Sequence, residues 1–193
     1  MKIKFAGIMK SMDDLPERQL PDSAERLKEP KSIIILNLIT LIVAFPIARI
    51  MLEIAGIRMD YETAVKPMLL WGVAAALICI LPHEIIHGIA MGGEEIPVYF
   101  SPKNLIAFVL LDKAMSKGRF IFVLLAPSLV LGWLPFIIAL IFPHFPASGF
   151  LAAMGCAGVL AGLGDMIKLT VTAVQVPKDG TVQGSGGYIY WYQ

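Results

Sequence analysis

Residues 67–91 read PMLLWGVAAALICILPHEIIHGIAM. This apolar run is long enough to cross a bilayer as a helix, which takes roughly 20 residues for about 30 Å of hydrocarbon. Near its end stands the pattern His83-Glu84-Ile85-Ile86-His87, which holds two of the three histidines of the chain. On a helix His83 and His87 project from one face, so their imidazoles can bind one metal ion. The stretch therefore predicts a membrane helix with a metal site near one end.

Ionisable side chains inside a membrane span cost roughly a few kcal/mol each and are functional by default. Glu84 directly follows the first histidine, where a carboxylate can act as general base toward a metal-bound water. These residues predict a catalytic centre with Glu84 as the base and with His83 and His87 as metal ligands. The alternative is a pair of hydrogen-bonded histidines at a helix end, with Glu84 at the membrane interface.

The composition of the whole chain agrees with a membrane protein. Of its 193 residues, 57% are hydrophobic and 16% are charged, whereas about 25% are charged in a typical globular domain. The mean hydropathy is +0.74, and a soluble fold of this size could not bury so much apolar surface. A net charge of +1 without a basic patch argues against a nucleic-acid partner. The lipid bilayer is thus the expected surrounding.

Four apolar segments of membrane length define the predicted fold. They cover about residues 33–52, 67–91, 120–142 and 147–174. We therefore predict an all-α membrane protein with about four transmembrane helices and a small membrane-associated β-hairpin between the second and the third. The predicted membrane domain covers residues 32–176, between an N-terminal tail (1–31) and a C-terminal tail (177–193).

Positive charges predict the orientation of these segments. The N-terminal tail has seven Lys/Arg, and the link between the second and third segments has four, counting Arg119 at its end. The link between the first and second segments has two, and the link between the third and fourth has none. By the positive-inside rule, both tails and the 92–118 link are expected to be cytosolic.

The hairpin is predicted by two β-prone runs, 96–100 and 105–111, on either side of the turn signal Ser101-Pro102-Lys103-Asn104. We assign Asn104 to the turn, with a substrate contact as the alternative. Near residue 190 the chain has an aromatic run, Tyr188-Ile189-Tyr190-Trp191-Tyr192. The four residues before it, Gly184-Ser185-Gly186-Gly187, are interpreted as a flexible hinge. This run is expected either at the lipid headgroups or as an added strand at a sheet edge.

A catalytic zinc takes three protein ligands and one open position, so the two histidines need a partner. Asp165 is the candidate because it is the only carboxylate of the fourth segment. His83 and Asp165 lie 16 and 18 residues from the outer ends of their segments, or about 24 and 27 Å deep on helices. The alternative role of Asp165 is an ion pair with Lys168 at i+3. Close helix packing, which can bring Asp165 to the motif, is predicted by the small-residue stripe Gly155, Gly158 and Gly162.

Three motifs carry a resemblance to a known family. They are Leu81-Pro82-His83-Glu84-Ile85-Ile86-His87-Gly88, Leu125-Ala126-Pro127 and Gly164-Asp165. Together they resemble the bacterial putative zincin peptidases, four-span proteins related in design to the site-2 proteases. Site-2 proteases bind zinc through an HExxH helix and an aspartate of a later span, which implies His83, His87 and Asp165 as ligands here. That class has an Asn-Pro or Leu-Asp-Gly context around the aspartate, where this chain reads Ala161-Gly162-Leu163-Gly164-Asp165-Met166.

The resemblance also implies a substrate and a place of action. Site-2 proteases pair an extended substrate with a membrane-associated hairpin. This implies a membrane protein or peptide as partner, with Val98, Phe100, Asn104 and Phe108 as substrate-binding residues. We therefore predict an intramembrane zinc metalloprotease of the bacterial cell membrane. The alternatives are a membrane transporter, or an inert metal-binding membrane protein, that uses the same cluster of His, Glu and Asp.

Overall fold

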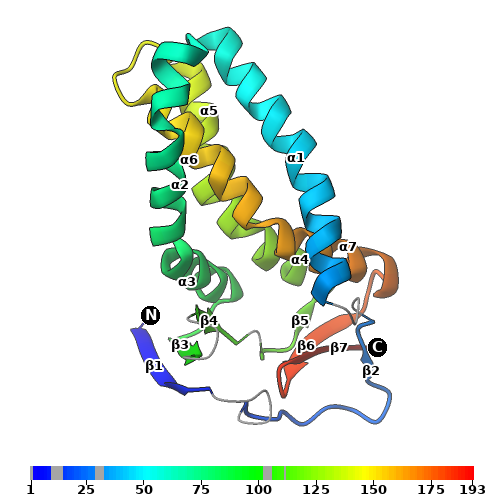
Figure 1. The fold of residues 1–193 in the computed structure, drawn as a ribbon. Helices are drawn as coiled ribbons and strands as arrows, with labels where there is room; N and C mark the ends of the chain where they lie inside the picture. The colour runs from blue at the N-terminus through cyan, green and yellow to red at the C-terminus, as the bar shows by residue number, and fades with distance from the viewer. Residues whose placement is uncertain (1, 10–14, 29–32, 102–105, 111) are drawn as a thin grey trace. The chain divides into compact units, whose positions relative to one another are not determined.

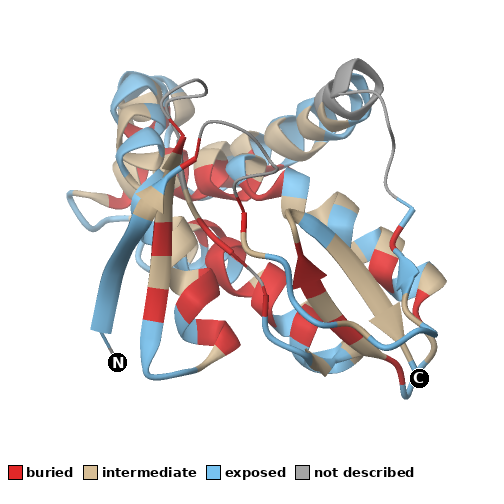
Figure 2. Ribbon diagram, turned by 90° about the horizontal axis from the view of Figure 1, so that it is seen from below, coloured by how far each residue is buried: buried red, intermediate tan, exposed pale blue. Residues whose placement is uncertain are grey.

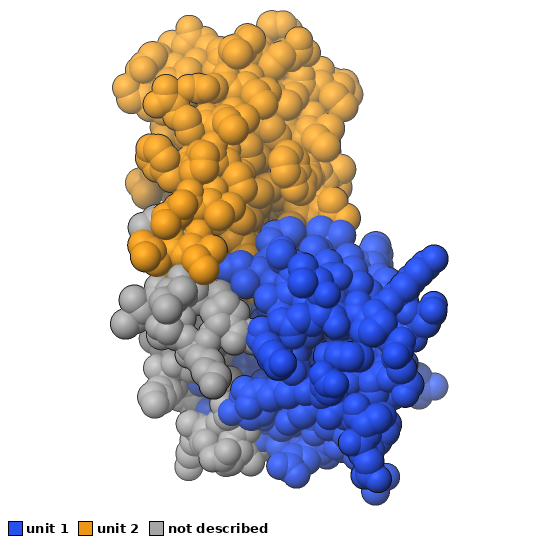
Figure 3. Space-filling view, turned by 90° about the vertical axis from the view of Figure 1, so that its right-hand side faces the viewer, with its two compact units in different colours: residues 1–29, 81–126, 166–193 blue, residues 30–80, 127–165 orange. Residues whose placement is uncertain are grey.

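The computed structural model describes residues 2–9, 15–28, 33–101, 106–110 and 112–193. The chain folds into two compact units, which Figure 3 colours separately. One unit contains residues 1–29, 81–126 and 166–193, and the other contains residues 30–80 and 127–165. Most of the described residues are helical, and both of the small sheets belong to the first unit.

The second unit is built from helices that pack around α6 (Ser148–Ala161). Its neighbours are two helices from the first half of the chain, α1 (Ile33–Arg58) and α2 (Leu69–Ile78). The π-helical turn η4 (Ser128–Trp133) and the helix α5 (Leu134–Ile141) also pack on it. Two short turns, η2 (Tyr61–Val65) and η3 (Lys66–Met68), precede α2. Glycines permit close approach: a Cβ on Gly158 would lie 2.4 Å from the Leu131 carbonyl oxygen. The predicted packing role of the small-residue stripe is confirmed.

The first unit contains the predicted hairpin, which is confirmed as β3 (Glu95–Ser101) and β4 (Ile106–Val109). The two strands pair antiparallel, with Val98 opposite Val109. Strand β1 (Lys2–Ile8) adds to β3 in parallel, which gives a three-stranded sheet in the order β1-β3-β4 (Figure 1). One face of this sheet packs on α3 (Ile80–Met91) and α4 (Lys117–Pro127), with Ile96, Val98 and Val123 in the core. Figure 2 marks such buried positions in red.

A second sheet has the strand order β2-β7-β6-β5, where β2 is Glu25–Arg26, β5 is Met115–Ser116, β6 is Thr181–Ser185 and β7 is Tyr188–Tyr192. The C-terminal aromatic run is therefore a strand, as one of the two expectations had it, although it lies between β2 and β6 rather than at an edge. The expectation of a flexible hinge was wrong. Gly186 and Gly187 have φ values of 54° and 77°, which suit the tight two-residue turn of a β-hairpin.

The all-α class was too narrow, because the ends of the chain contribute strands to both sheets. Polar contacts also attach the N-terminal residues 15–28 to the rest of their unit. Arg18 donates from Nε to Asp112 Oδ2 over 2.9 Å, and its backbone N–H donates to Ser185 Oγ over 2.8 Å. The hydrogen bond and charge of Asp112 raise the pKa of Arg18, so this guanidinium stays ionised.

Two described helices, Leu38–Arg58 and Lys117–Ile141, are long and apolar enough to cross a membrane by themselves. Two bent pairs also qualify if each is one span: Tyr61–Ile78 with Ile80–Met91, and Ser148–Ala161 with Leu163–Gln175. The bends measure 50° and 45°. The described part of the chain thus has two to four candidate spans, which overlap the four predicted segments.

Each bend has a local cause in the sequence. Pro82 has no N–H for the Ile78 carbonyl, and its ring clashes with that carbonyl, so α2 and α3 cannot form one straight helix. Gly162 stands at the break between α6 and α7 (Leu163–Gln175), and glycine is a poor former of helix interiors. A new helix therefore begins after each bend, and a predicted metal ligand, His83 or Asp165, lies in its first turn.

Gly88→Ala is expected to destabilise the first unit. A Cβ at Gly88 would lie 2.3 Å from Ile96 Cγ2, so α3 and β3 would have to move apart. Such overpacking costs about 1–3 kcal/mol, which thermal unfolding in detergent, followed by circular dichroism, measures. Gly118→Ala is the control, because nothing lies within 4 Å of its added Cβ. Equal unfolding temperatures for the two variants would contradict the predicted tight contact.

Candidate metal centre

Helix α3 presents both histidines of the HExxH motif on one face. The His83 and His87 rings lie 4.9 Å apart between centroids and meet edge to face at 78°. His83 is half-buried, whereas His87 is only 3% exposed. The i and i+4 spacing on the helix has thus brought the two imidazoles together, as predicted.

Asp165 lies in the first turn of α7, directly after the break at Gly162. Its backbone N–H donates to the Gly162 carbonyl oxygen over 3.1 Å. The rest of α7, from Met166 on, belongs to the same compact unit as the HExxH motif. At the far end of α7, Lys117 Nζ donates to the Ala173 and Val176 carbonyl oxygens over 2.8 and 2.6 Å. These bonds fix the C-terminal end of the helix that holds Asp165.

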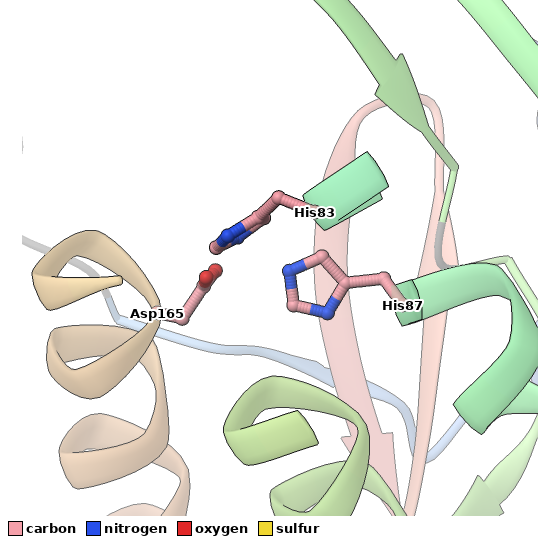
Figure 4. A group of neighbouring side chains, drawn as sticks. All are labelled: His83, His87 and Asp165. Carbon is pink, nitrogen blue, oxygen red and sulfur yellow. The ribbon is translucent and has the colours of Figure 1, made fainter. Parts of the chain in front are cut away.

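The predicted trio comes together in the structure. His83 and His87 each offer a ring nitrogen and Asp165 offers a carboxylate oxygen, and these three atoms lie within 4.8 Å of one another. Figure 4 shows the two imidazoles and the carboxylate pointing toward a common point. Two imidazoles and one carboxylate are the donor set of many catalytic zinc sites, which leave a fourth position open. The residues therefore fit a zinc ion.

A backbone carbonyl orients the buried histidine. His87 Nδ1 lies 2.8 Å from the Val123 carbonyl oxygen. A carbonyl can only accept, so we assign the proton of the neutral ring to Nδ1, which leaves the lone pair of Nε2 for a metal. Metal-binding histidines commonly have such an outer partner, which fixes both the tautomer and the ring direction.

Glu84 is attached to the hairpin rather than to another side chain. Its Oε2 accepts a hydrogen bond of 3.0 Å from the Val109 backbone N–H. Among the described strands, β4 lies at one edge of its sheet, and this N–H points off that edge toward α3. The expected base is therefore held between the HExxH helix and the last strand of the described sheet.

The predicted substrate-binding residues lie in different surroundings. Val98 is 8% exposed and packs in the core beside Val109. Phe108 is half-buried and stacks on Tyr99, with 5.7 Å between ring centroids. Phe100 is also half-buried. Asn104 lies outside the described residues.

Two contributors to the site were missed because they are backbone groups. The Val109 N–H and the Val123 carbonyl contact Glu84 and His87, but the valine side chains indicate nothing of this. Every residue except proline carries the same two main-chain groups, so only the fold selects the ones that act.

An HExxH helix whose histidines lie beside a carboxylate is the ligand pattern typical of zinc peptidases. Residues 66–180, more than half of the chain, match the family described as putative zincin peptidase. The chain belongs to this family, as its motifs indicated. The matched region includes all three side chains of the cluster, and zinc is the metal that the family implies. No curated protein and no solved structure matches the chain.

Proposed function

We propose that this zincin-family protein is an intramembrane zinc metalloprotease that hydrolyses peptide bonds of membrane-embedded or membrane-proximal substrates. One observation carries the proposal: His83 and His87, which flank Glu84 in the HExxH motif, come together with Asp165. The motif and Asp165 each lie on a bent pair of helices that can form one membrane span. The family supports metallopeptidase chemistry, and the apolar helices support a site reached from the membrane.

The roles of the residues follow from their contacts. His83, His87 and Asp165 would hold the metal, and zinc bound there supplies Lewis acidity that polarises a water molecule and the scissile carbonyl. Glu84 takes the water proton and passes it to the leaving amine. Because Oε2 of Glu84 is held by the Val109 N–H, Oε1 is the oxygen that exchanges the proton.

The edge of β4 is the proposed binding place for the substrate. A peptide in a membrane helix has its carbonyls in intrahelical hydrogen bonds, so it must unwind before a water can attack. Pairing with an edge strand holds a peptide extended and replaces the lost main-chain bonds. Strand β4 has such an edge, and its Val109 N–H already lies at Glu84. Phe100 and Phe108 on this hairpin are proposed to contact the side chains of the substrate.

We further propose that four spans cross the membrane with both termini in the cytosol. An even number of crossings returns the chain to the side where it began. The surplus of Lys/Arg in residues 1–31 and 92–119 favours the cytosolic side for both segments. The metal ligands then lie toward the cytosolic half of the bilayer.

Removal of the metal tests the proposed function. The protein is reconstituted in liposomes with a panel of membrane-spanning peptides, and bound metal is measured together with cleavage. We expect about one zinc per chain, loss of cleavage when a chelator removes the zinc, and recovery when zinc is returned. Cleavage that persists without metal would overturn the proposal. Zinc transport across the liposome membrane without cleavage would favour the transporter alternative.

A further inference from the structure

Pro127 ends helix α4 and is fully buried. In an α-helix, the carbonyl of residue i accepts the N–H of residue i+4. The residue four positions before Pro127 is Val123. Proline has no N–H, and its ring clashes with the carbonyl at i−4. Pro127 therefore leaves the Val123 carbonyl without its i+4 donor, and the ring clash disfavours the straight helical direction of that carbonyl.

The same carbonyl is the one that His87 uses. Val123 is 0% exposed and His87 is 3% exposed, so water does not compete for this contact. A buried carbonyl oxygen needs a donor, and His87 Nδ1 lies 2.8 Å from it. The donor that Pro127 does not provide to the Val123 carbonyl is thus replaced by His87 Nδ1 of the helix α3.

We infer that Pro127 is a positioning residue for the metal centre. By leaving the Val123 carbonyl to His87, it fixes the proton on Nδ1 and directs Nε2 toward His83 and Asp165. This inference rests on the proposed metal site. It also gives a reason for the Leu125-Ala126-Pro127 motif, which does not contribute a side chain to the His83, His87 and Asp165 cluster.

Pro127→Ala supplies an N–H that competes for the Val123 carbonyl. Loss of a group that hydrogen-bonds to a metal-binding histidine typically lowers the metal affinity by roughly 10–100-fold. We therefore expect Pro127→Ala to bind zinc about tenfold more weakly than the wild type. In zinc-free protein labelled with 15N-histidine, the His87 signals are expected to shift toward the tautomer protonated on Nε2. The chain has only three histidines, and His87→Gln identifies the signals of His87.

Two further variants separate the missing N–H from a general loss of structure. Pro135→Ala removes a buried proline at the start of α5, and it should keep the zinc affinity and His87 signals of the wild type. An α-hydroxy acid in place of Pro127 lacks both the ring and the N–H, and it should also behave like the wild type. If this ester variant is as impaired as Pro127→Ala, the ring matters rather than the N–H, and the inference fails.

An unchanged His87 tautomer in Pro127→Ala would also overturn the inference. The test does not depend on proteolysis. If the wild type binds zinc but cleaves no peptide, the proposed function fails while the role of Pro127 is still measured. If the wild type binds no zinc at all, the proposed site fails, and the tautomer signals of the zinc-free protein still decide whether Pro127 sets His87.

Discussion

Glu84→Gln is expected to abolish peptide cleavage while zinc remains bound. Glutamine has the size of glutamate, and its amide oxygen can still accept the Val109 N–H that Glu84 Oε2 now accepts. It cannot take a proton from water, and a positioned general base contributes roughly 10²–10⁴-fold to a rate. The fold and the three metal ligands stay in place, so only the chemical step is lost.

Cleavage rates and bound zinc, measured on the same reconstituted samples, check this expectation. Glu95→Gln is a matched control, since Glu95 lies exposed on β3. Its Oε2 forms an exposed ion pair with Lys4 Nζ over 3.2 Å. Exposed ion pairs contribute little, so this variant should retain wild-type cleavage. A rate within threefold of the wild type for Glu84→Gln would remove Glu84 as the base. It would then favour one of the non-proteolytic alternatives.

Asp165→Ala is expected to weaken zinc binding by more than the roughly 10–100-fold that loss of an outer-shell partner causes. The substitution removes one of three ligand-bearing side chains that lie within 4.8 Å of one another. The two histidines alone leave the ion with two open positions instead of one, and cleavage should be lost with the metal.

Competition with a fluorescent zinc chelator measures the affinity of the Asp165 variant. Asp179→Ala is the control, because Asp179 is exposed and follows the end of α7. The control should bind zinc as the wild type does. Unchanged affinity in Asp165→Ala would show that this carboxylate is not a ligand, and the ion-pair alternative with Lys168 would then take its place.

Local patterns were sufficient to predict much of this structure. The spacing of His83 and His87 predicted a shared face because helical geometry depends only on neighbouring residues. The runs around Ser101-Pro102 predicted the β3–β4 hairpin for the same reason, since both strands lie close together in the sequence. Asp165 was found because few carboxylates occur in apolar segments, so that chemistry rather than geometry singled it out.

Long-range pairing was not predictable in the same way. Strand β1 pairs with β3 across about 90 residues of chain, with Lys2 opposite Glu95, and no local pattern names such a partner. The aromatic run predicted a strand at a sheet edge as one of two alternatives, but it did not predict that β7 lies between β2 and β6. The choice among possible partners depends on which apolar faces meet in the core.

The sequence by itself determined the reactive groups: two imidazoles, two carboxylates and the apolar helices that carry them. Only the tertiary structure decided which main-chain groups hold them, namely the Val109 N–H at Glu84 and the Val123 carbonyl at His87. The physical reason is that side chains differ from residue to residue, whereas backbone N–H and C=O groups are nearly identical along the chain. Their roles are therefore assigned by position in the fold, and Pro127 is a rare case in which a missing N–H is visible in the sequence.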